Sequence, residues 1–381
     1  MSSRVRPWRE AATVLLTAGG GGSGEVVAGG SFDYQLLLLR RSPRSAFLPS
    51  AHVFPGGLAD AADFSPEWLP LLPPEPRCSG LPGGASAKAP LFAAERPELG
   101  AAALPGEVAF RLCAIRETFE EAGVLLLAPE EGSASSSSSA SPASLLPPER
   151  LPPPAELSEW RRRVQRQPGS FLQLCRLLGC VPNLWALHEW SNWLTPVGRE
   201  GRGGRRYDTA FFLCCLGQGP PEASHDEGEV TACQWSTPSE AVELFKSQDI
   251  WIAPPQFYEL CRLCNFSSLR DLHAFGSKRA LEGCERWMPV LLVASDGHMQ
   301  ILPGDELYPE DPDLTGEKKP ILTSDKKIEE LMKGANKLHR IVTQNLNHVS
   351  VHVNIRQKYK HINPLIIDSK AGNSADCNSR L

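Results

Sequence analysis

One stretch in the first third of the chain restricts the fold more than any other feature. Between residues 108 and 123, apolar side chains recur at helical spacing and, with Leu112 as origin, fall within about a 60° arc. Such a narrow stripe predicts a helix that packs one side against a core, and its apolar positions are Val108, Leu112, Ile115 and Phe119. Gly123 is placed to end this helix, because glycine adopts a left-handed conformation without steric penalty.

The same helix carries three glutamates on its other side, Glu117, Glu120 and Glu121. Each pair of like charges on one helix face costs roughly 0.2–0.5 kcal/mol, so a cation among the three would explain why the sequence tolerates them. Arg116 lies four residues before Glu120 and can pair with it. From these residues alone, an ordinary solvated acidic face stays an open alternative.

A longer sequence motif around these glutamates favours a bound cation over a solvated acidic face. Residues 116–123 read Arg-Glu-x-x-Glu-Glu-x-Gly, with apolar Val124 after them and a Pro-Gly-Gly turn upstream at 55–57. This resembles the signature of the Nudix hydrolases, Gly-x5-Glu-x7-Arg-Glu-apolar-x-Glu-Glu-x-Gly-apolar. The resemblance implies an α/β fold, the Nudix α/β/α sandwich, with a large insertion inside the signature and a C-terminal elaboration. It also implies Mg²⁺ or Mn²⁺ held by Glu117 and Glu121, with Glu120 as a third ligand.

The match departs from the family pattern in three ways. The family glycine is assigned to Gly57, but a long insertion separates it from Arg116. The early glutamate is assigned to Glu107, although eight residues rather than seven lie between it and Arg116. Thr118 stands where the family has an aliphatic residue. The resemblance makes Arg116 an orienter of the glutamates, and it leaves the general base open between Glu117 and a carboxylate outside the helix.

Composition divides the chain into segments. We predict a Nudix domain over residues 10–265, a C-terminal elaboration over 266–365 and a polar tail over 366–381. Residues 60–105 contain nine prolines, which disfavour long helices and central strands. This insertion either packs on the domain as a lid or substrate wall, through Trp68, Leu71, Leu72, Phe92 and Leu99, or is a passive surface loop. Residues 129–154 are rich in serine and proline and are predicted to be disordered.

Hydrophobic patterning predicts the order of the remaining elements. Strands are expected at residues 11–18, 32–41, 124–127, 185–197, 207–216 and 230–235. Helices are expected at residues 156–166, 170–178 and 239–246. The C-terminal elaboration is predicted to hold a hairpin (289–294 and 299–302), a polar helix near 325–339 and a strand at 349–355.

Further candidate contacts flank the acidic helix. By resemblance, Gly56 and Gly57 bring backbone close to a diphosphate, a role suited to residues without a Cβ atom. Glu229 and Glu227 precede a strand and are candidates for an additional metal carboxylate. The basic loop at 199–206 either contacts phosphates or is a solvated hairpin tip.

Charge and composition limit the partners. The net charge of −5 argues against a nucleic-acid partner, because such proteins usually carry a broad basic surface. Eleven cysteines at irregular spacing fit a reducing compartment better than a disulfide framework. No apolar run approaches 18 residues, so no membrane span is expected.

The last three residues read Ser379-Arg380-Leu381. They keep the small, basic and leucine pattern that the peroxisomal import receptor reads, so we expect a peroxisomal location. Three arginines among the first nine residues leave a mitochondrial leader as the alternative.

Four features together resemble the peroxisomal acyl-coenzyme A diphosphatases. They are the Nudix motif, the large insertion inside it, the Ser/Pro-rich segment and the C-terminal tripeptide. That resemblance implies metal-dependent hydrolysis of the diphosphate in coenzyme A and acyl-CoA to adenosine 3′,5′-bisphosphate and (acyl-)4′-phosphopantetheine. Arg40 or Arg41 would then meet the 3′-phosphate. Two alternatives stay open: a Nudix hydrolase acting on another nucleoside diphosphate derivative or on RNA caps, and a non-catalytic nucleotide-binding module. The module would be expected to lack one of the carboxylates, and all three are present.

Overall fold

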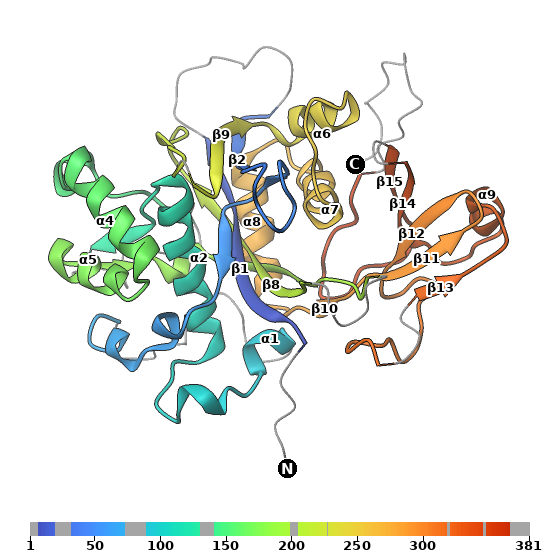
Figure 1. The fold of residues 1–381 in the computed structure, drawn as a ribbon. Coiled ribbons are helices and arrows are strands. Elements are labelled where there is room, and N and C mark those ends of the chain that lie inside the picture. The colour runs from blue at the N-terminus through green and yellow to red at the C-terminus, as the bar shows by residue number, and fades with distance from the viewer. Residues whose placement is uncertain are drawn as a thin grey trace.

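A mixed eight-stranded sheet organises the larger part of the molecule (Figure 1). The computed structural model describes residues 7–19, 32–72, 89–129, 141–198, 205–226, 228–317, 321–345 and 348–365. The sheet order is β10-β7-β8-β1-β2-β3, with β4 paired to β1 and β9 paired to β2. Its strands are β1 (Arg9–Gly19), β2 (Tyr34–Arg41), β3 (His52–Val53), β4 (Gly56–Leu58), β7 (His188–Leu194), β8 (Tyr207–Leu216), β9 (Val230–Ser236) and β10 (Arg286–Trp287).

Strand β1 is the centre of this sheet. It runs parallel to β8 and antiparallel to β2 and β4, and from Ala11 onward all its residues are buried. Burial on both faces explains why residues 11–18 read as a continuous apolar run rather than an alternating one. The strands predicted at 11–18, 32–41, 207–216 and 230–235 are all confirmed, and the one at 185–197 is confirmed over β7.

Each face of the sheet is covered by helices, which confirms the α/β/α sandwich. Val14 and Leu16 point to one core with α2 (Gly106–Ala122), outside which α4 (Pro154–Arg166) and α5 (Ser170–Leu178) pack. Leu15 points to the other core, shared with α6 (Pro238–Lys246), α7 (Pro254–Leu263) and α8 (Leu269–Ala280). The period of two along β1 thus assigns successive side chains to opposite layers. None of the described helices has both the length and the apolar character needed to cross a bilayer.

The described part of the proline-rich insertion packs onto the first core. It forms only short turns of helix, namely η1 (Ala61–Phe64), η2 (Pro66–Trp68), α1 (Pro90–Ala93) and η3 (Pro97–Leu99). Trp68, Leu71, Leu72 and Phe92 are buried in the core, and Leu99 packs against its edge. The alternative of a passive surface loop is therefore wrong for these residues, because their apolar side chains are removed from water.

Two predictions after the acidic helix need correction. Disorder over residues 129–154 is wrong for 141–154: the Ala143 N–H donates to Cys215 O at 2.8 Å, and Leu146 is buried. Pairing with the end of β8 supplies the order that the Ser/Pro composition lacks. The short strand predicted at 124–127 is instead β5 (Leu127–Pro129), which pairs with β6 (Cys180–Pro182). Residues 130–140 lie outside the described residues.

A five-stranded sheet forms the C-terminal part, in the order β13-β11-β12-β14-β15. The predicted hairpin and final strand are confirmed as β11 (Val290–Ala294), β12 (Gly297–Ile301) and β15 (His348–Val353). The helix predicted at 325–339 is right only for α9 (Ile328–Met332); β14 (His339–Asn345) follows, and β13 is Ile321–Thr323. Helix α8 and β10, which the prediction placed in this elaboration, pack on β7 of the first sheet. The chain then returns to α7, where the Leu365 N–H donates to Cys261 O.

Candidate active site

Helix α2 crosses the first core; Glu117 is mostly buried and all the other residues of the helix are buried. It packs against β1 and β4 of the sheet and against η1, α1 and α4. The alternative of a solvated acidic face is therefore wrong. Gly123 ends the helix in the left-handed conformation (φ 73°), and its N–H donates to Phe119 O, as predicted. Thr118, the departure from the family pattern, satisfies its hydroxyl within the helix by donating to Ala114 O at 2.7 Å.

Arg116 positions the carboxylates, which agrees with the orienting role expected for it. Its Nη1 donates to Glu117 Oε1 at 2.8 Å and to Glu120 Oε1 at 2.7 Å. Its Nη2 also donates to Leu58 O at 2.9 Å, which ties α2 to β4. The guanidinium is nearly fully buried, so these charge-assisted bonds hold it in one orientation.

The strongest partner of Arg116 is Asp63, a residue that the sequence analysis missed. Both oxygens of Asp63 accept from the guanidinium, each at 2.9 Å, and both side chains are buried. Five residues separate Gly57 from Asp63, so Asp63 stands at the early acidic position of the family signature. The assignment of that position to Glu107 is wrong. Glu107 lies in the first turn of α2, where its carbonyl accepts from Arg111.

The spacing Gly57-x5-Asp63 was available in the sequence as a signal. The match to the early acidic position of the signature was missed for two reasons: aspartate stands in place of glutamate, and a long insertion follows it. Asp63 lies in η1, within residues 60–105, and the extra residues that separate it from Arg116 follow it in the chain. A capping box fixes this turn, because Asp60 accepts from Ala62 N while Asp63 accepts from Asp60 N.

The Pro-Gly-Gly turn meets α2 at Glu117 and Glu121. The Gly56 N–H donates to Glu121 Oε2 at 2.9 Å. A Cβ atom on Gly57 would lie 2.5 Å from Cδ of Glu117, so a larger residue there would displace that carboxylate from its present position. Thr13 of β1 anchors the turn by donating to Pro55 O at 2.7 Å. The structure therefore brings the predicted residues Gly56, Gly57, Glu117 and Glu121 together.

Arg40 and Arg41 lie in different surroundings, because neighbouring residues on a strand point to opposite faces. Burial and Glu117 raise the pKa of Glu121, and the nearby charge of Arg41 opposes that rise. The charge of Arg40 acts instead on His52, whose pKa is lowered by burial and by that arginine. Arg41 Nη2 donates to Ser45 Oγ, and its Nη1 has no hydrogen-bond partner among the described residues. Of the two candidates, Arg41 is the one beside the carboxylates.

The end of α2 is held by α4 and by the loop before β9. Arg161 Nε and Gln165 Nε2 donate to Glu120 O at 2.8 and 3.0 Å. Gln165 also contacts Asp226, which accepts from the Val230 N–H. Glu229 is exposed, and its charge raises the pKa of both Glu120 and Glu121. Glu229 thus remains a candidate carboxylate.

Two other predicted contacts are not brought to the site by the described residues. Glu227 lies outside them, as do residues 199–204 of the basic loop. Arg206, at the end of that loop, is buried and donates to the carbonyl oxygens of Thr195 and Leu314, so it has a structural role.

The carboxylates carry more negative charge than their partners neutralise. Burial, opposed by Arg116 and reinforced by Glu120, raises the pKa of Glu117 to about 7. Burial and the neighbouring Glu117 raise the pKa of Glu121 well above its usual range, and burial also raises that of Glu120. Among the described residues, Glu117 Oε2 and Glu121 Oε1 accept no hydrogen bond. A divalent cation beside both carboxylates would stabilise their ionised forms and offset the repulsion between them, so the pair fits a hard cation.

The predicted convergence of all three glutamates is not seen. Within the described ranges, no three His, Cys, Asp or Glu side chains gather closely enough to hold an ion as they stand. Glu120 is turned toward Arg116, while Glu117 and Glu121 both face the glycine turn. The pair Glu117 and Glu121 is therefore the better-supported ligand set.

The raised pKa values predict how pH affects the metal-free protein. A carboxylate with a raised folded-state pKa contributes stability that is present below its unfolded pKa and is lost as pH rises through its folded pKa. For Glu117 this loss falls between about pH 4.5 and 7 and amounts to roughly 3 kcal/mol. In urea unfolding with a chelator present, Glu117→Gln should become more stable than the wild type as pH rises from 5 to 8. Parallel pH profiles for the two proteins would contradict this assignment.

Sequence comparison identifies the family. Residues 8–263 match the family model described as the NUDT19 Nudix domain, and residues 291–354 match the one described as the NUDT19 C-terminal domain. The chain belongs to the NUDT19 family of Nudix hydrolases. The Nudix match includes the glycine turn, Asp63 and α2, and the C-terminal match covers most of the five-stranded sheet. Nudix hydrolases generally use divalent metal ions, which agrees with the charge on Glu117 and Glu121.

Relatives of the NUDT19 family align with the whole chain. A Gallus gallus protein named acyl-coenzyme A diphosphatase NUDT19 is 63% identical, with 100% of both chains covered. A Homo sapiens protein of the same name is 46% identical over 96% of this chain and 97% of its own. Among solved structures, a Nudix hydrolase from Alicyclobacillus acidocaldarius covers 70% of this chain and 96% of its own, at 20% identity and a TM-score of 0.47.

Proposed function

We propose that the protein hydrolyses the diphosphate bond of coenzyme A and acyl-CoA, using Mg²⁺ or Mn²⁺. Similarity over the full length to proteins named acyl-coenzyme A diphosphatase supports the substrate class. The observation that carries the chemistry is the pair Glu117 and Glu121, held over the glycine turn and beside Arg41. The products are adenosine 3′,5′-bisphosphate and 4′-phosphopantetheine or its acyl ester.

The chain's own residues have distinct roles in this reaction. Glu117 and Glu121 would hold the metal ion, which neutralises phosphate oxygens and lowers the pKa of bound water. Arg116, fixed by Asp63, keeps Glu117 in place. The Pro-Gly-Gly turn leaves the carboxylates accessible because its glycines have no side chains. Water adds to one phosphorus atom, the bond from phosphorus to the bridging oxygen breaks, and a proton leaves the attacking water.

Arg41 is the proposed contact for the 3′-phosphate of coenzyme A. Charge-assisted hydrogen bonds of this kind contribute roughly 1.5–3 kcal/mol, or about 10–150-fold in kcat/KM. We expect Arg41→Met to lower kcat/KM by this factor for coenzyme A and to leave dephospho-CoA nearly unchanged. In the wild type, dephospho-CoA should be at least about tenfold poorer than coenzyme A, and ADP-ribose poorer still.

Two control variants separate recognition from loop structure. Arg40→Met removes the neighbouring charge, which acts on His52 rather than on Glu121, so it should have little effect on either substrate. Ser45→Ala removes the partner of Arg41 Nη2 but keeps the guanidinium. If Arg41→Met and Ser45→Ala reduce turnover of both substrates equally, Arg41 only supports the loop.

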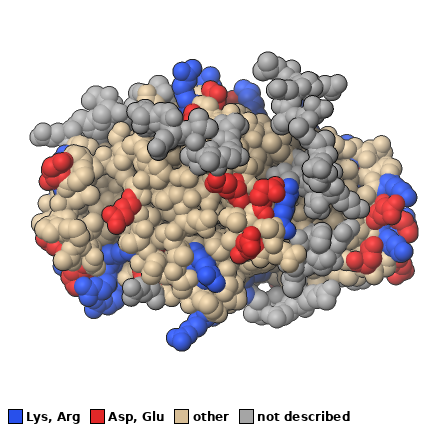
Figure 2. Space-filling model, turned by 90° about the horizontal axis from the view of Figure 1, so that it is seen from above, with Lys and Arg blue, Asp and Glu red and all other residues tan. Residues whose placement is uncertain are grey.

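A turnover screen tests the substrate class. Coenzyme A, acyl-CoA, ADP-ribose, NADH, dinucleoside polyphosphates and a nucleotide-capped RNA would be offered with Mg²⁺. On the face shown in Figure 2, charged side chains of the described residues form small groups of mixed sign rather than a continuous basic groove. This face therefore gives no support to a nucleic-acid substrate. Preferred hydrolysis of capped RNA would contradict the proposal, and binding without turnover of any substrate would favour a non-catalytic module.

The proposal extends to location. Ser379-Arg380-Leu381 lies outside the described residues, and its pattern is the support for a peroxisomal address. A fluorescent protein extended by residues 366–381 should enter peroxisomes, and removal of the last three residues should leave it in the cytosol. Peroxisomal import that persists without these three residues would contradict the assignment, as would mitochondrial import of the full chain.

A further inference from the structure

The C-terminal end of α2 is capped by groups from outside the helix. The last turn of a helix leaves carbonyl oxygens without partners inside it. Here Glu120 O accepts from Arg161 Nε at 2.8 Å and from Gln165 Nε2 at 3.0 Å. Ala122 O accepts from the Ser224 N–H at 3.0 Å. The end of the helix that carries the proposed metal ligands is therefore fixed by α4 and by the loop before β9.

Arg161 joins these two elements with a single guanidinium group. While its Nε donates to Glu120 O, its Nη1 donates to Ser224 Oγ at 3.0 Å and its Nη2 to Ser224 O at 2.8 Å. The guanidinium is planar and presents its N–H donors in a fixed fork. Bonds from all three of its nitrogens therefore fix the position of the loop at Ser224 relative to the last turn of α2.

The same contacts continue along the loop to Glu229. Gln165 Nε2, which donates to Glu120 O, also lies 3.3 Å from Asp226 Oδ2. That carboxylate in turn accepts from the Glu229 N–H at 3.3 Å. The Glu229 carbonyl accepts from the N–H of Ser42, the residue after β2, at 2.7 Å. The backbone of Glu229 is thus fixed between α4 and the end of β2.

The loop and Arg161 lie close enough to the carboxylates to act on them electrostatically. Burial and Glu117 raise the pKa of Glu121, and the charge of Glu229 adds to that rise. Burial lowers the pKa of Arg161, while nearby acidic groups that include Asp226 and Glu121 act in the opposite direction. By its charge alone, Arg161 would oppose the binding of a cation at Glu121.

From these contacts we propose that Arg161 is a positioning residue of the diphosphatase site. It fixes the end of α2 against the loop that carries Glu229, so that the carboxylates keep the geometry that a divalent ion requires. The inference rests on the proposed function and deepens it, because it gives a role in metal binding to α4, an element outside the Nudix signature.

Positioning and charge predict opposite results for Arg161→Met. Removal of a positive charge near Glu121 would by itself strengthen the binding of a cation. Loss of a group that orients metal ligands typically weakens metal affinity by about 10–100-fold. We therefore expect Arg161→Met to bind Mn²⁺ roughly tenfold more weakly than the wild type, measured by calorimetry without substrate. A residue with a purely structural role would lower the Tm and leave the affinity for Mn²⁺ unchanged.

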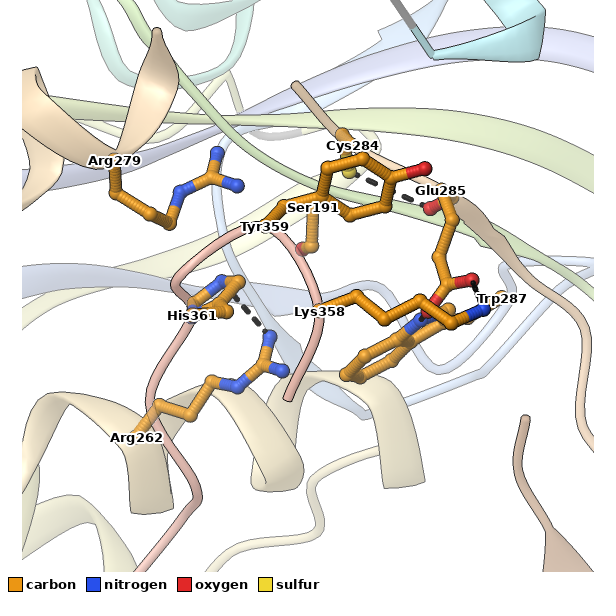
Figure 3. A pocket seen from close by; sticks show the side chains of 9 residues that line it. All are labelled: Ser191, Arg262, Arg279, Cys284, Glu285, Trp287, Lys358, Tyr359 and His361. Carbon is orange, nitrogen blue, oxygen red and sulfur yellow. Dashed lines mark hydrogen bonds and ion pairs between the residues drawn. The ribbon is translucent and has the colours of Figure 1, made fainter. Parts of the chain in front are cut away.

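Two further variants separate positioning from charge. Gln165→Met removes the bonds to Glu120 O and Asp226 without changing the charge, so it should also weaken Mn²⁺ binding. It covers the case in which Arg161→Met does not fold. Lys358→Met removes one positive charge on the opposite side of the sheet, beside a small cavity where Lys358 pairs with Glu285 at 2.9 Å (Figure 3). This control should leave Mn²⁺ affinity unchanged.

The outcomes distinguish this role from the proposed function. With coenzyme A as substrate, Arg161→Met should need more Mg²⁺ for half-maximal rate and should keep a KM for coenzyme A close to the wild-type value. Unchanged or tighter Mn²⁺ binding by Arg161→Met would overturn the positioning role, as would weaker binding by Lys358→Met. A wild type that binds Mn²⁺ but does not hydrolyse coenzyme A would contradict the proposed function, while the Mn²⁺ affinities would still decide whether Arg161 positions the metal site.

Discussion

Glu121→Gln should reduce turnover by roughly 10³-fold or more while the protein remains folded. The change keeps the shape of the side chain and its bond from the Gly56 N–H, but it removes one of the two anionic oxygens that face the glycine turn. Removing a buried carboxylate whose pKa is raised also relieves repulsion with Glu117, so the metal-free variant should be at least as stable as the wild type. Steady-state kinetics with coenzyme A at saturating Mg²⁺ would measure the loss.

Glu107→Gln is the matched control for this variant. Glu107 is also a buried glutamate of α2, but it lies in the first turn, away from Arg116 and the glycine turn. Its substitution should leave kcat close to the wild-type value. Normal folding of Glu121→Gln with near wild-type turnover would contradict the metal assignment.

Asp63→Asn should impair both stability and activity. The substituted amide would offer one neutral oxygen where Arg116 now has two anionic ones, and breaking a buried ion pair costs roughly 3–5 kcal/mol. Because Arg116 also holds Glu117 and Glu120, a less constrained guanidinium should lower kcat by roughly 10–100-fold. Chemical denaturation and steady-state kinetics would measure the two effects.

The comparison of Asp63→Asn with Glu107→Gln decides between the two interpretations of the signature. The structure assigns the early acidic position to Asp63, whereas the spacing to Arg116 alone pointed to Glu107. A large loss of kcat in Glu107→Gln, with little loss in Asp63→Asn, would favour Glu107 instead.

Local patterns were sufficient for much of the fold and for part of the site. The apolar run at residues 11–18 and the terminating Gly123 each depend on short-range chemistry, and each is confirmed. The acidic triad on α2 was visible for the same reason. The resemblance named Gly56 and Gly57 as a diphosphate contact and Glu117 and Glu121 as metal ligands, whereas the contacts between the turn and these glutamates come from the structure.

The errors arose where distant residues determine the outcome. Asp63 reaches Arg116 across the insertion, so its role depends on how that insertion packs. Residues 141–154 are ordered by pairing with β8, and β14 is a strand because β12 and β15 flank it. Sequence patterns alone do not predict these tertiary contacts, and strand formation depends strongly on tertiary context.

The central claim, hydrolysis of a diphosphate, is tested most directly by product analysis in ¹⁸O-labelled water. Purified protein with Mg²⁺ and an acyl-CoA should give adenosine 3′,5′-bisphosphate and acyl-4′-phosphopantetheine, with the label in one phosphate product and the thioester intact. The Glu121→Gln variant should give neither product at a comparable rate. Release of free fatty acid with intact coenzyme A, or no cleavage by the wild type, would contradict the account.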